Sequence, residues 1–193
     1  FNNSSPLLTT SLHIPRLHEG LINRSVLMDR VDQILDFPLT LISAPAGFGK
    51  TTLLSQWIST RKHLSLQDRV AWVSLEQECD LRQFWTYTIT ALQELRAGIG
   101  TSALASLDTS QSHIHATLRI LINEISRIAE EFVLILDDYH HIDDPAVHAT
   151  LTFFIDHLPL NLHLVIASRS QPPLSVARWR ASNRLYELRE EDL

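Results

Sequence analysis

The sequence predicts an α/β fold in which a mostly parallel central sheet carries helices on both faces. The main observation is an alternation: short apolar segments typical of buried strands are separated by longer segments with apolar residues at helical spacing. The second is size, because 193 residues are enough for one domain with a buried core. The third is a composition of 45% hydrophobic and 20% charged residues, which is ordinary for globular proteins and disfavours wholesale disorder.

The first strand–loop–helix unit lies near the N-terminus. Asn, Ser, Thr and two prolines without periodicity indicate an extended arm at the start of the chain. Ser25 is expected to cap a helix that ends at Pro38, because proline lacks the N–H that a helix interior needs. A β-rich run and a turn-rich segment then lead into a second helical pattern. In chain order we expect an arm over 1–20, a helix from Ser25, a strand over 39–42, a loop over 43–52 and a helix through Ile58.

The alternation continues to the C-terminus. Asp80 and Gln83 are spaced as a capping box at the start of a helix. The segment 97–112, rich in Gly, Ser and Thr, fits either a loop or a weak helix. The helix capped by Asp80 is expected to hold Phe84, Ile89, Leu92 and Leu95. The remaining expected elements are a strand over 70–75, helices over 114–128 and 145–158, strands over 132–136 and 163–167, and a final segment over 184–188. In such sheets ligands bind at the carboxyl ends of the strands.

Charge and cysteine content exclude several classes of function. Sixteen Lys and Arg against 22 Asp and Glu give a net charge of −6, so the chain lacks the cationic surface that neutralises nucleic-acid phosphates. We expect any DNA binding by the full protein to lie outside this chain. The single cysteine, Cys79, excludes an internal disulfide and a cysteine-rich zinc site, and no basic partner activates it as a catalytic thiol.

The ends of the chain and its apolar runs indicate the setting. No apolar run approaches the ~18 residues that span a bilayer, and no signal peptide opens the chain. We therefore expect a cytoplasmic protein with no membrane partner. Because the chain starts at Phe1 rather than Met and stops at Leu193, we also expect it to be a piece of a longer polypeptide.

A glycine-rich loop carries the strongest functional signal. Residues 43–52 resemble the Walker A P-loop, G-x-x-x-x-G-K-[ST], between a predicted strand and a predicted helix, which disfavours an ordinary turn. Glycines let consecutive N–H groups face phosphate oxygens, and the helix adds its positive end. Lys50 would reach the β- and γ-phosphates and the Thr51 hydroxyl would bind Mg²⁺. Ala44 replaces the first glycine of the pattern and leaves the phosphate-facing half intact. The expected nucleotide contacts are Ala46, Gly47, Phe48, Gly49, Lys50, Thr51 and Thr52.

Two aspartates end the strand predicted over 132–136, an arrangement that resembles Walker B. Asp137 is expected to hold Mg²⁺ directly or through water. Asp138 is expected to polarise an attacking water. Alone, the pattern fits a capped strand end equally well, but its position downstream of a P-loop favours the catalytic reading.

Arg169 follows the strand predicted over 163–167. In P-loop ATPases of the ASCE division this strand lies between the P-loop strand and the Walker B strand, so the residue at its tip can contact the γ-phosphate (the sensor 1 position). An arginine there makes a charge-assisted contact that exists with ATP and not with ADP. An exposed loop arginine is the alternative. With these motifs the predicted fold is an α/β P-loop NTPase of the ASCE type.

Other polar residues have structural explanations. His140 and His141 are adjacent and expected to point in different directions, so we predict no metal site there. Glu76, Glu78 and Asp80 are expected to form a solvated loop and a helix cap. A solvated face or a domain contact explains the C-terminal arginines better than a DNA patch; they are Arg178, Arg180, Arg184 and Arg189. Spacing typical of core residues is found for Trp57, Phe84 and Trp85.

In order and spacing, these motifs resemble the N-terminal NTPase domain of the MalT-like, LuxR-type transcriptional regulators, members of the STAND class of signal-transduction ATPases. The likeness covers nearly the whole chain. It is carried by residues 14–17, 21–24, 43–52, 71–75, 84–87, 134–142, 167–169 and 185–189.

The resemblance implies an ATP- and Mg²⁺-binding domain that switches slowly between a closed ADP-held state and an open ATP-held state, with weak hydrolysis. It implies partners: other domains of the polypeptide (winged helix, helical sensor, DNA-binding helix-turn-helix) and self-association in the ATP state. In related STAND proteins the segment around Arg24 lies near the adenine, so Leu21, Ile22 and Arg24 are implied base-site residues. The resemblance thus implies that residues 1–24 are an arm that includes the adenine segment and that residues 25–193 are the NTPase core.

Two other classes of function stay open. One is a turnover enzyme, either a P-loop kinase, which would need an acceptor site and an arginine-bearing lid, or a motor ATPase with a neighbour's arginine finger. The other is a degenerate P-loop interaction module. The intact Gly49, Lys50, Thr51, Asp137 and Asp138 speak against the second.

Overall fold

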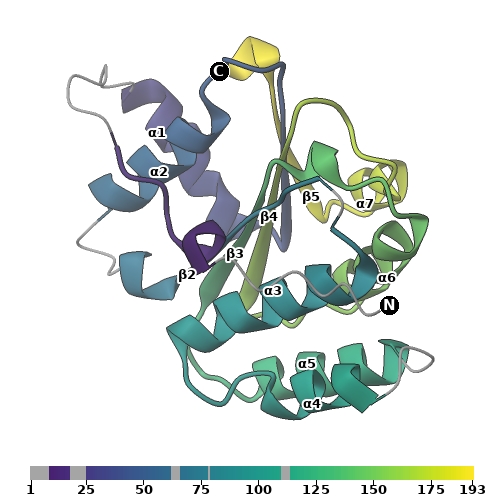
Figure 1. Ribbon diagram of the computed structural model, residues 1–193. Helices are drawn as coiled ribbons and strands as arrows, with labels where there is room; N and C mark the ends of the chain where they lie inside the picture. The colour runs from purple at the N-terminus through teal and green to yellow at the C-terminus, as the bar shows by residue number, and fades with distance from the viewer. Residues whose placement is uncertain (1–8, 18–24, 62–65, 78, 110–113) are drawn as a thin grey trace.

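A five-stranded parallel sheet forms the centre of the molecule (Figure 1). The computed structural model describes residues 9–17, 25–61, 66–77, 79–109 and 114–193. The sheet has the order β2-β3-β4-β1-β5, and every neighbouring pair runs parallel. All carboxyl ends therefore meet at one edge, as predicted. The strands are β1 (Leu39–Ser43), β2 (Val70–Ser74), β3 (Phe132–Asp137), β4 (Leu162–Ser168) and β5 (Leu185–Arg189).

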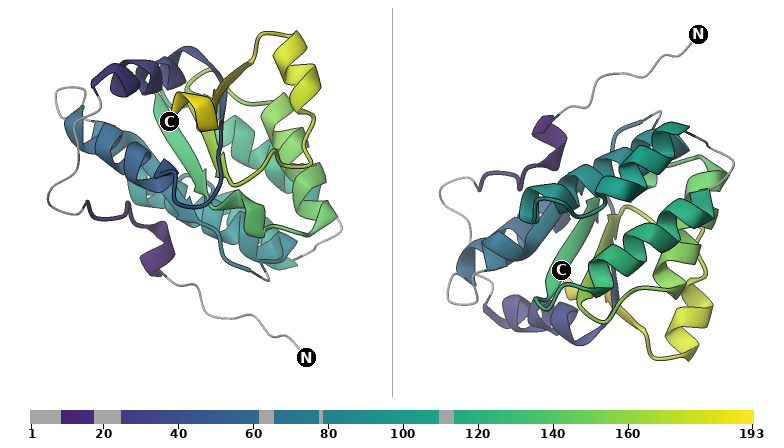
Figure 2. Two further views of the ribbon diagram at one scale, coloured as in Figure 1. Left: turned by 90° about the horizontal axis from the view of Figure 1, so that it is seen from above. Right: turned by 90° about the horizontal axis from the view of Figure 1, so that it is seen from below.

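Helices cover both faces of the sheet (Figures 1 and 2). One face carries α1 (Ser25–Asp32), η2 (Gln33–Asp36) and α2 (Lys50–Thr60). The other carries α3 (Leu81–Leu95), α4 (Thr101–Thr109), α5 (Ile114–Ser126), α6 (Pro145–Asp156) and α7 (Val176–Ala181). The short 3-10 turns are η1 (Thr9–Leu12), η4 (Leu66–Arg69), η6 (Tyr139–His141) and η7 (Glu190–Asp192). Within the described ranges, no helix combines the length and apolar character that a membrane crossing requires.

Alternation along the strands divides the core into two clusters. On β3, Val133 and Ile135 pack with α1 and α2, whereas Leu134 and Leu136 pack with the larger set of helices. This is the period of two expected of a strand buried on both faces. The continuous apolar run before Asp137 is therefore a central strand.

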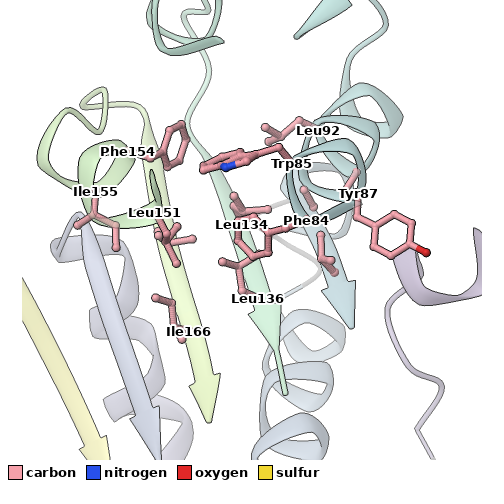
Figure 3. Close-up of a cluster of buried hydrophobic side chains, with 14 of the residues drawn as sticks. Phe84, Trp85, Tyr87, Leu92, Leu134, Leu136, Leu151, Phe154, Ile155 and Ile166 are labelled. Atoms are coloured by element: carbon pink, nitrogen blue, oxygen red, sulfur yellow. The ribbon is translucent and has the colours of Figure 1, made fainter. Parts of the chain in front are cut away.

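The larger cluster is centred on aromatic side chains of α3 that face β3 and α6 (Figure 3). Phe84 and Trp85 are fully buried, as predicted, and their rings meet edge to face with centroids 5.2 Å apart. The Trp85 indole donates to Thr150 Oγ1 at 3.1 Å, so its polar atom is satisfied inside the core. On the other face Trp57 is likewise buried, and its indole donates to Asp32.

Several helix ends lie where capping residues and proline predict them. The capping box is confirmed: Asp80 Oδ1 accepts from the Gln83 N–H at 2.8 Å, and the Gln83 side chain accepts from the Asp80 N–H at 3.3 Å. Ser25 is the first residue of α1, and its cap role depends on a side chain outside the described residues. The helix continues as the 3-10 turn η2 and stops before Pro38.

One segment that the sequence left open forms a helix, and two elements were not expected. The segment left open as loop or weak helix contains α4. The short helix α7 had no clear sequence signal, because six residues hold fewer than two turns of apolar periodicity. The arm contains η1, which packs beside β2: Leu12 is buried, and the Ser11 hydroxyl donates to Glu76 at 3.0 Å.

Candidate functional site

Three loops converge at the carboxyl edge of the sheet. They follow β1, β3 and β4, and β4 lies between the other two. This is the strand order that the ASCE division has, with the Arg169 strand between the P-loop strand and the Walker B strand. The topology therefore brings the glycine-rich loop, the two aspartates and Arg169 to one place.

The glycine-rich loop is open toward solvent. Gly47 and Gly49 have positive φ angles of 85° and 78°, which other residues adopt only with strain. A Cβ at either position would find no atom within 4 Å, so free space lies in front of the loop. Gly49 caps α2, and the N-terminus of that eleven-residue helix has unpaired N–H groups and a positive dipole end. The loop is thus shaped for an anion such as phosphate.

Lys50 is a buried cation at the start of α2, with 6% of its surface exposed. Its Nζ donates to the carbonyl oxygens of Ala44 at 2.7 Å and Pro45 at 3.1 Å, so the side chain folds back over its own loop. Burial lowers the pKa of Lys50, and the charge of Arg169 lowers it further, while Asp138 and Asp137 raise it. No ion pair of Lys50 is found among the described residues, and a bound phosphate would supply an opposite charge at close range.

Thr51 and Asp137 form a pair of oxygen donors. The Thr51 hydroxyl donates to Asp137 Oδ2 at 2.8 Å, joining α2 to the end of β3. Asp137 is 1% exposed, and its Oδ1 accepts the N–H of Asp138 at 3.0 Å. Burial raises the pKa of Asp137 to about 6, although the Thr51 hydrogen bond lowers it.

This pair fits magnesium. Mg²⁺ prefers carboxylate and hydroxyl oxygens and completes its shell with phosphate and water oxygens. In the described part of the chain, no three His, Cys, Asp or Glu side chains gather as a metal cluster. An ion at Thr51 and Asp137 would therefore take most of its ligands from a nucleotide and from water.

Asp138 sits in a left-handed backbone conformation, with φ 55° and ψ 37°. This conformation costs a non-glycine residue about 1–2 kcal/mol. The kink ends β3 and begins η6, so that Asp138 leaves the line of the strand while Asp137 stays within it. The Asp138 side chain is 42% exposed, and its Oδ1 lies 3.7 Å from His140 Nδ1.

Arg169 is exposed directly after β4. Its charge contributes to lowering the pKa values of both Lys50 and His140, so all three residues lie at the same edge of the sheet. The preceding Ser168 is buried, and its Oγ has no hydrogen-bond partner in the described part of the chain.

A cavity of about 860 Å³ adjoins this edge. It lies between the turn after β3, the first turns of α6 and the segment after β4. Its lining includes His140, Asp143, His148, Ser168, Ser170 and Gln171.

The structure brings most of the predicted site residues together. Lys50, Thr51, Asp137, Asp138 and Arg169 surround the carboxyl edge. The loop and first turn of α2 hold Ala46, Gly47, Phe48, Gly49 and Thr52. The implied base-site residues Leu21, Ile22 and Arg24 lie outside the described residues.

The prediction for the two histidines was wrong in its geometry. The rings of His140 and His141 lie together, with centroids 4.1 Å apart, because the tight turn η6 folds them toward the same side. Sequence reasoning also missed that His140 lies beside Asp138. The available signal was its position two residues after the catalytic candidate.

Residues set aside on sequence grounds behave as expected in two cases. The C-terminal arginines are paired: Arg180 binds Glu187 through two bonds of 2.7 and 2.8 Å, Arg189 binds Glu187 at 3.3 Å, Arg178 binds Asp156, and Arg184 donates to the Ile155 carbonyl at 2.9 Å. Burial raises the pKa of Cys79 to about 12, and nearby carboxylates add to the effect. It is therefore a thiol, not a thiolate, at neutral pH.

Sequence comparison finds a domain family and larger relatives. The AAA ATPase domain family matches residues 23–167. The HTH-type transcriptional regulator MalT of Yersinia enterocolitica is 34% identical over 192 residues, 97% of this chain and 20% of the regulator. MalT of Yersinia pestis has the same identity and coverage. The chain thus spans about a fifth of the length of the curated relatives it matches.

Structure comparison supports the fold. The ORC1 protein of Aeropyrum pernix, solved in complex with DNA, aligns with a TM-score of 0.56 at 13% identity, covering 89% of this chain and 46% of that one. Drosophila ORC bound to DNA aligns with a TM-score of 0.53 at 13% identity, covering 86% and 87%. At such low identity these likenesses speak only for the fold, and with the family match they confirm the predicted α/β P-loop NTPase architecture.

Proposed function

Because this chain belongs to the AAA ATPase domain family, we propose that its carboxyl-edge site binds ATP together with Mg²⁺ and that the nucleotide acts as a conformational switch. One observation carries the proposal. The Thr51 hydroxyl and the Asp137 carboxylate lie 2.8 Å apart beside an open glycine loop, and the Lys50 ammonium is hydrogen-bonded to the backbone of that loop. A structural turn needs no such convergence of buried cation, buried carboxylate and free space.

Each residue has a role in nucleotide binding. The exposed loop over 45–48 and the N-terminus of α2 would bind the phosphates through N–H groups. Lys50 would exchange the carbonyls of Ala44 and Pro45 for β- and γ-phosphate oxygens. Thr51 and Asp137 would hold Mg²⁺. When bound, the ion neutralises the phosphate charge that develops during transfer.

Hydrolysis would depend on Asp138. Its carboxylate is partly exposed at the tip of β3, where it can accept a proton from a water molecule. Arg169 at the tip of the neighbouring strand would contact the γ-phosphate. We expect weak turnover. Lys50 and Arg169 are the cations that the described part of the chain brings to the site, whereas fast phosphoryl transfer commonly uses a further arginine supplied by another subunit.

The same contacts supply the energy of a switch. Lys50 and Arg169 would bind the γ-phosphate in the ATP state and lose it after hydrolysis. Hydrogen bonds to charged groups contribute about 1.5–3 kcal/mol each. Two such contacts are enough to shift a two-state equilibrium by about a hundredfold or more.

The wider protein is part of the proposal. The similarity to MalT supports a cytoplasmic transcriptional regulator in which this domain controls self-association and DNA is bound by another domain. The net charge of −6 and the pairing of the C-terminal arginines support the separation of DNA binding from this chain.

The test compares ATP and ADP. We expect the chain, stripped of carried-over nucleotide, to bind both with Mg²⁺ and to hydrolyse ATP slowly. Asp138→Asn should keep the ATP affinity and lose hydrolysis, while Asp143→Asn, an exposed carboxylate on the same connection, should change neither. Equal hydrolysis by the wild type and Asp138→Asn would remove Asp138 from the reaction. Fast steady-state turnover would indicate a motor or kinase instead of a switch.

A further inference from the structure

We propose that His140 is a positioning residue for hydrolysis: its imidazole holds the Asp138 carboxylate in the orientation that accepts a proton from the attacking water. The inference rests on the proposed function, since it concerns the same reaction. In that reaction the water oxygen bonds to the γ-phosphorus while the bond from phosphorus to the β,γ-bridging oxygen breaks. The proton passes from water to Asp138 and then to the released phosphate.

The first observation concerns the ring nitrogens of His140. Its side chain is 12% exposed, and both ring nitrogens are buried without a hydrogen-bond partner in the described part of the chain. Leaving a buried polar group unpaired costs about 1–3 kcal/mol, so such groups in native proteins call for an explanation. Its Nδ1 lies 3.7 Å from Asp138 Oδ1, and a shift of under about 1 Å would make a hydrogen bond.

The second observation concerns Asp138. Its backbone is fixed by the left-handed conformation and by the N–H bond to Asp137 Oδ1. Its carboxylate has fewer contacts. Among the described residues, the basic side chain within 4 Å of this carboxylate is that of His140. A general base must be held in hydrogen-bond reach of its proton donor. A neighbouring donor that limits the rotation of the carboxylate supplies this.

The third observation is that the turn holding His140 is anchored. Tyr139 is buried, and its hydroxyl pairs with His148 Nδ1 on α6 at 2.8 Å. The His141 N–H donates to the Asp138 carbonyl at 3.1 Å, which closes the turn. The ring of His141 lies against that of His140. The backbone of the turn that carries the imidazole is therefore held by contacts to α6 and to Asp138.

The charge around the imidazole suits a neutral donor. Burial lowers the pKa of His140; the charges of His141, Arg169 and Lys50 lower it further, and Asp138 raises it. A neutral imidazole carries one N–H, which can bond a carboxylate without neutralising its charge. With Lys50 and Arg169 already positive, another cation is disfavoured at this position.

Three substitutions separate the donor from the rest of the side chain. His140→Ala removes it, His140→Asn places an amide N–H near the position of Nδ1, and His140→Gln places one near Nε2. Single-turnover hydrolysis of ATP and equilibrium ATP binding are measured in the full chain. We expect His140→Ala and His140→Gln to lower the rate about tenfold or more, and His140→Asn to keep it within about threefold of the wild type. The ATP affinity of all three variants should stay within about twofold of the wild type. His157→Ala, an exposed histidine at the end of α6, is the matched control.

A cycle with Asp138→Asn excludes a purely structural role. The cycle compares the residual single-turnover rates that long incubations detect in the Asp138→Asn background. If His140 acts through Asp138, adding His140→Ala to Asp138→Asn should not lower that residual rate further, whereas independent effects would multiply. Three results would overturn the inference: a wild-type rate in His140→Ala, a loss of ATP affinity that parallels the loss of rate, or a rate kept by His140→Gln and lost by His140→Asn. A wild-type chain that does not hydrolyse bound ATP, or that hydrolyses it without Asp138, would overturn the proposed reaction itself and His140's role with it.

Discussion

Asp137→Asn should stabilise the nucleotide-free chain at pH 7 while destroying its magnesium site. Asp137 is 1% exposed, and burial raises the pKa of its carboxyl from 3.8 to about 6. The folded chain therefore binds this proton more tightly than the unfolded chain. Stability gained from that proton is fully present below about pH 4 and is lost as the pH rises through about 6.

The size of the effect follows from the same shift. A difference of about 2 pH units at about 1.4 kcal/mol per unit corresponds to about 3 kcal/mol of destabilisation by the ionised carboxylate at pH 7. Asparagine carries no charge. Its carbonyl keeps the bond from the Asp138 N–H, and its amide can donate to the Thr51 hydroxyl. Allowing about 1 kcal/mol for the altered bonds, we expect a net gain of about 1–3 kcal/mol.

Urea unfolding at pH 7 and at pH 4.5 measures this gain. The variant should be more stable than the wild type at pH 7, and the difference should shrink at the lower pH. The exposed Asp143→Asn is the control and should stay within about 0.5 kcal/mol at both. With Mg-ATP the order should reverse, because only the wild type gains stability from the bound ion. A variant that is less stable at pH 7, or equally affected at both pH values, would refute the reasoning.

Two further predictions concern the fold. Gly100→Ala should cost about 2–4 kcal/mol in urea unfolding, because the new Cβ would lie 2.4 Å from Ile89 Cγ2 at a φ of 68°, whereas Gly98→Ala, at a φ of 98° with free space around it, should cost only the backbone strain of about 1–2 kcal/mol; equal losses would contradict this. Asp80→Ala should cost about 1 kcal/mol through loss of the helix cap, and Asp80→Asn, which keeps the acceptor, should cost less. Thermal unfolding distinguishes the two Asp80 variants.

Local signals made most of the fold predictable. Asp80 and Gln83 predicted the start of α3 because a capping box depends only on residues three positions apart. The apolar run before Asp137 predicted a buried strand, and the structure shows that helices cover both of its faces. The helix α7 was missed because six residues carry too little periodicity.

The site was predictable where parallel topology determines it. Thr51 and Asp137 are far apart in sequence. Thr51 lies just after the loop that follows β1, and Asp137 ends β3, so the parallel sheet brings both to its carboxyl edge, where they form a hydrogen bond. His140 could not be placed in this way. Its position depends on the left-handed φ of Asp138 and on the turn that follows, and neither has a signal in the residue types. The hydrogen bonds from Lys50 Nζ to the carbonyl oxygens of Ala44 and Pro45 likewise depend on loop geometry, which the residue types do not reveal.

The central claim is that the glycine loop and Lys50 bind the phosphates of ATP. Calorimetric titration of the nucleotide-stripped chain with Mg-ATP tests it most directly, with Lys50→Ala beside it. Arg96→Ala is the matched control, since this exposed arginine follows α3 at the opposite edge of the sheet and pairs with Glu130. The account predicts saturable binding by the wild type and Arg96→Ala, and none by Lys50→Ala. Unchanged ATP affinity in Lys50→Ala, or no binding by the wild type, would contradict it.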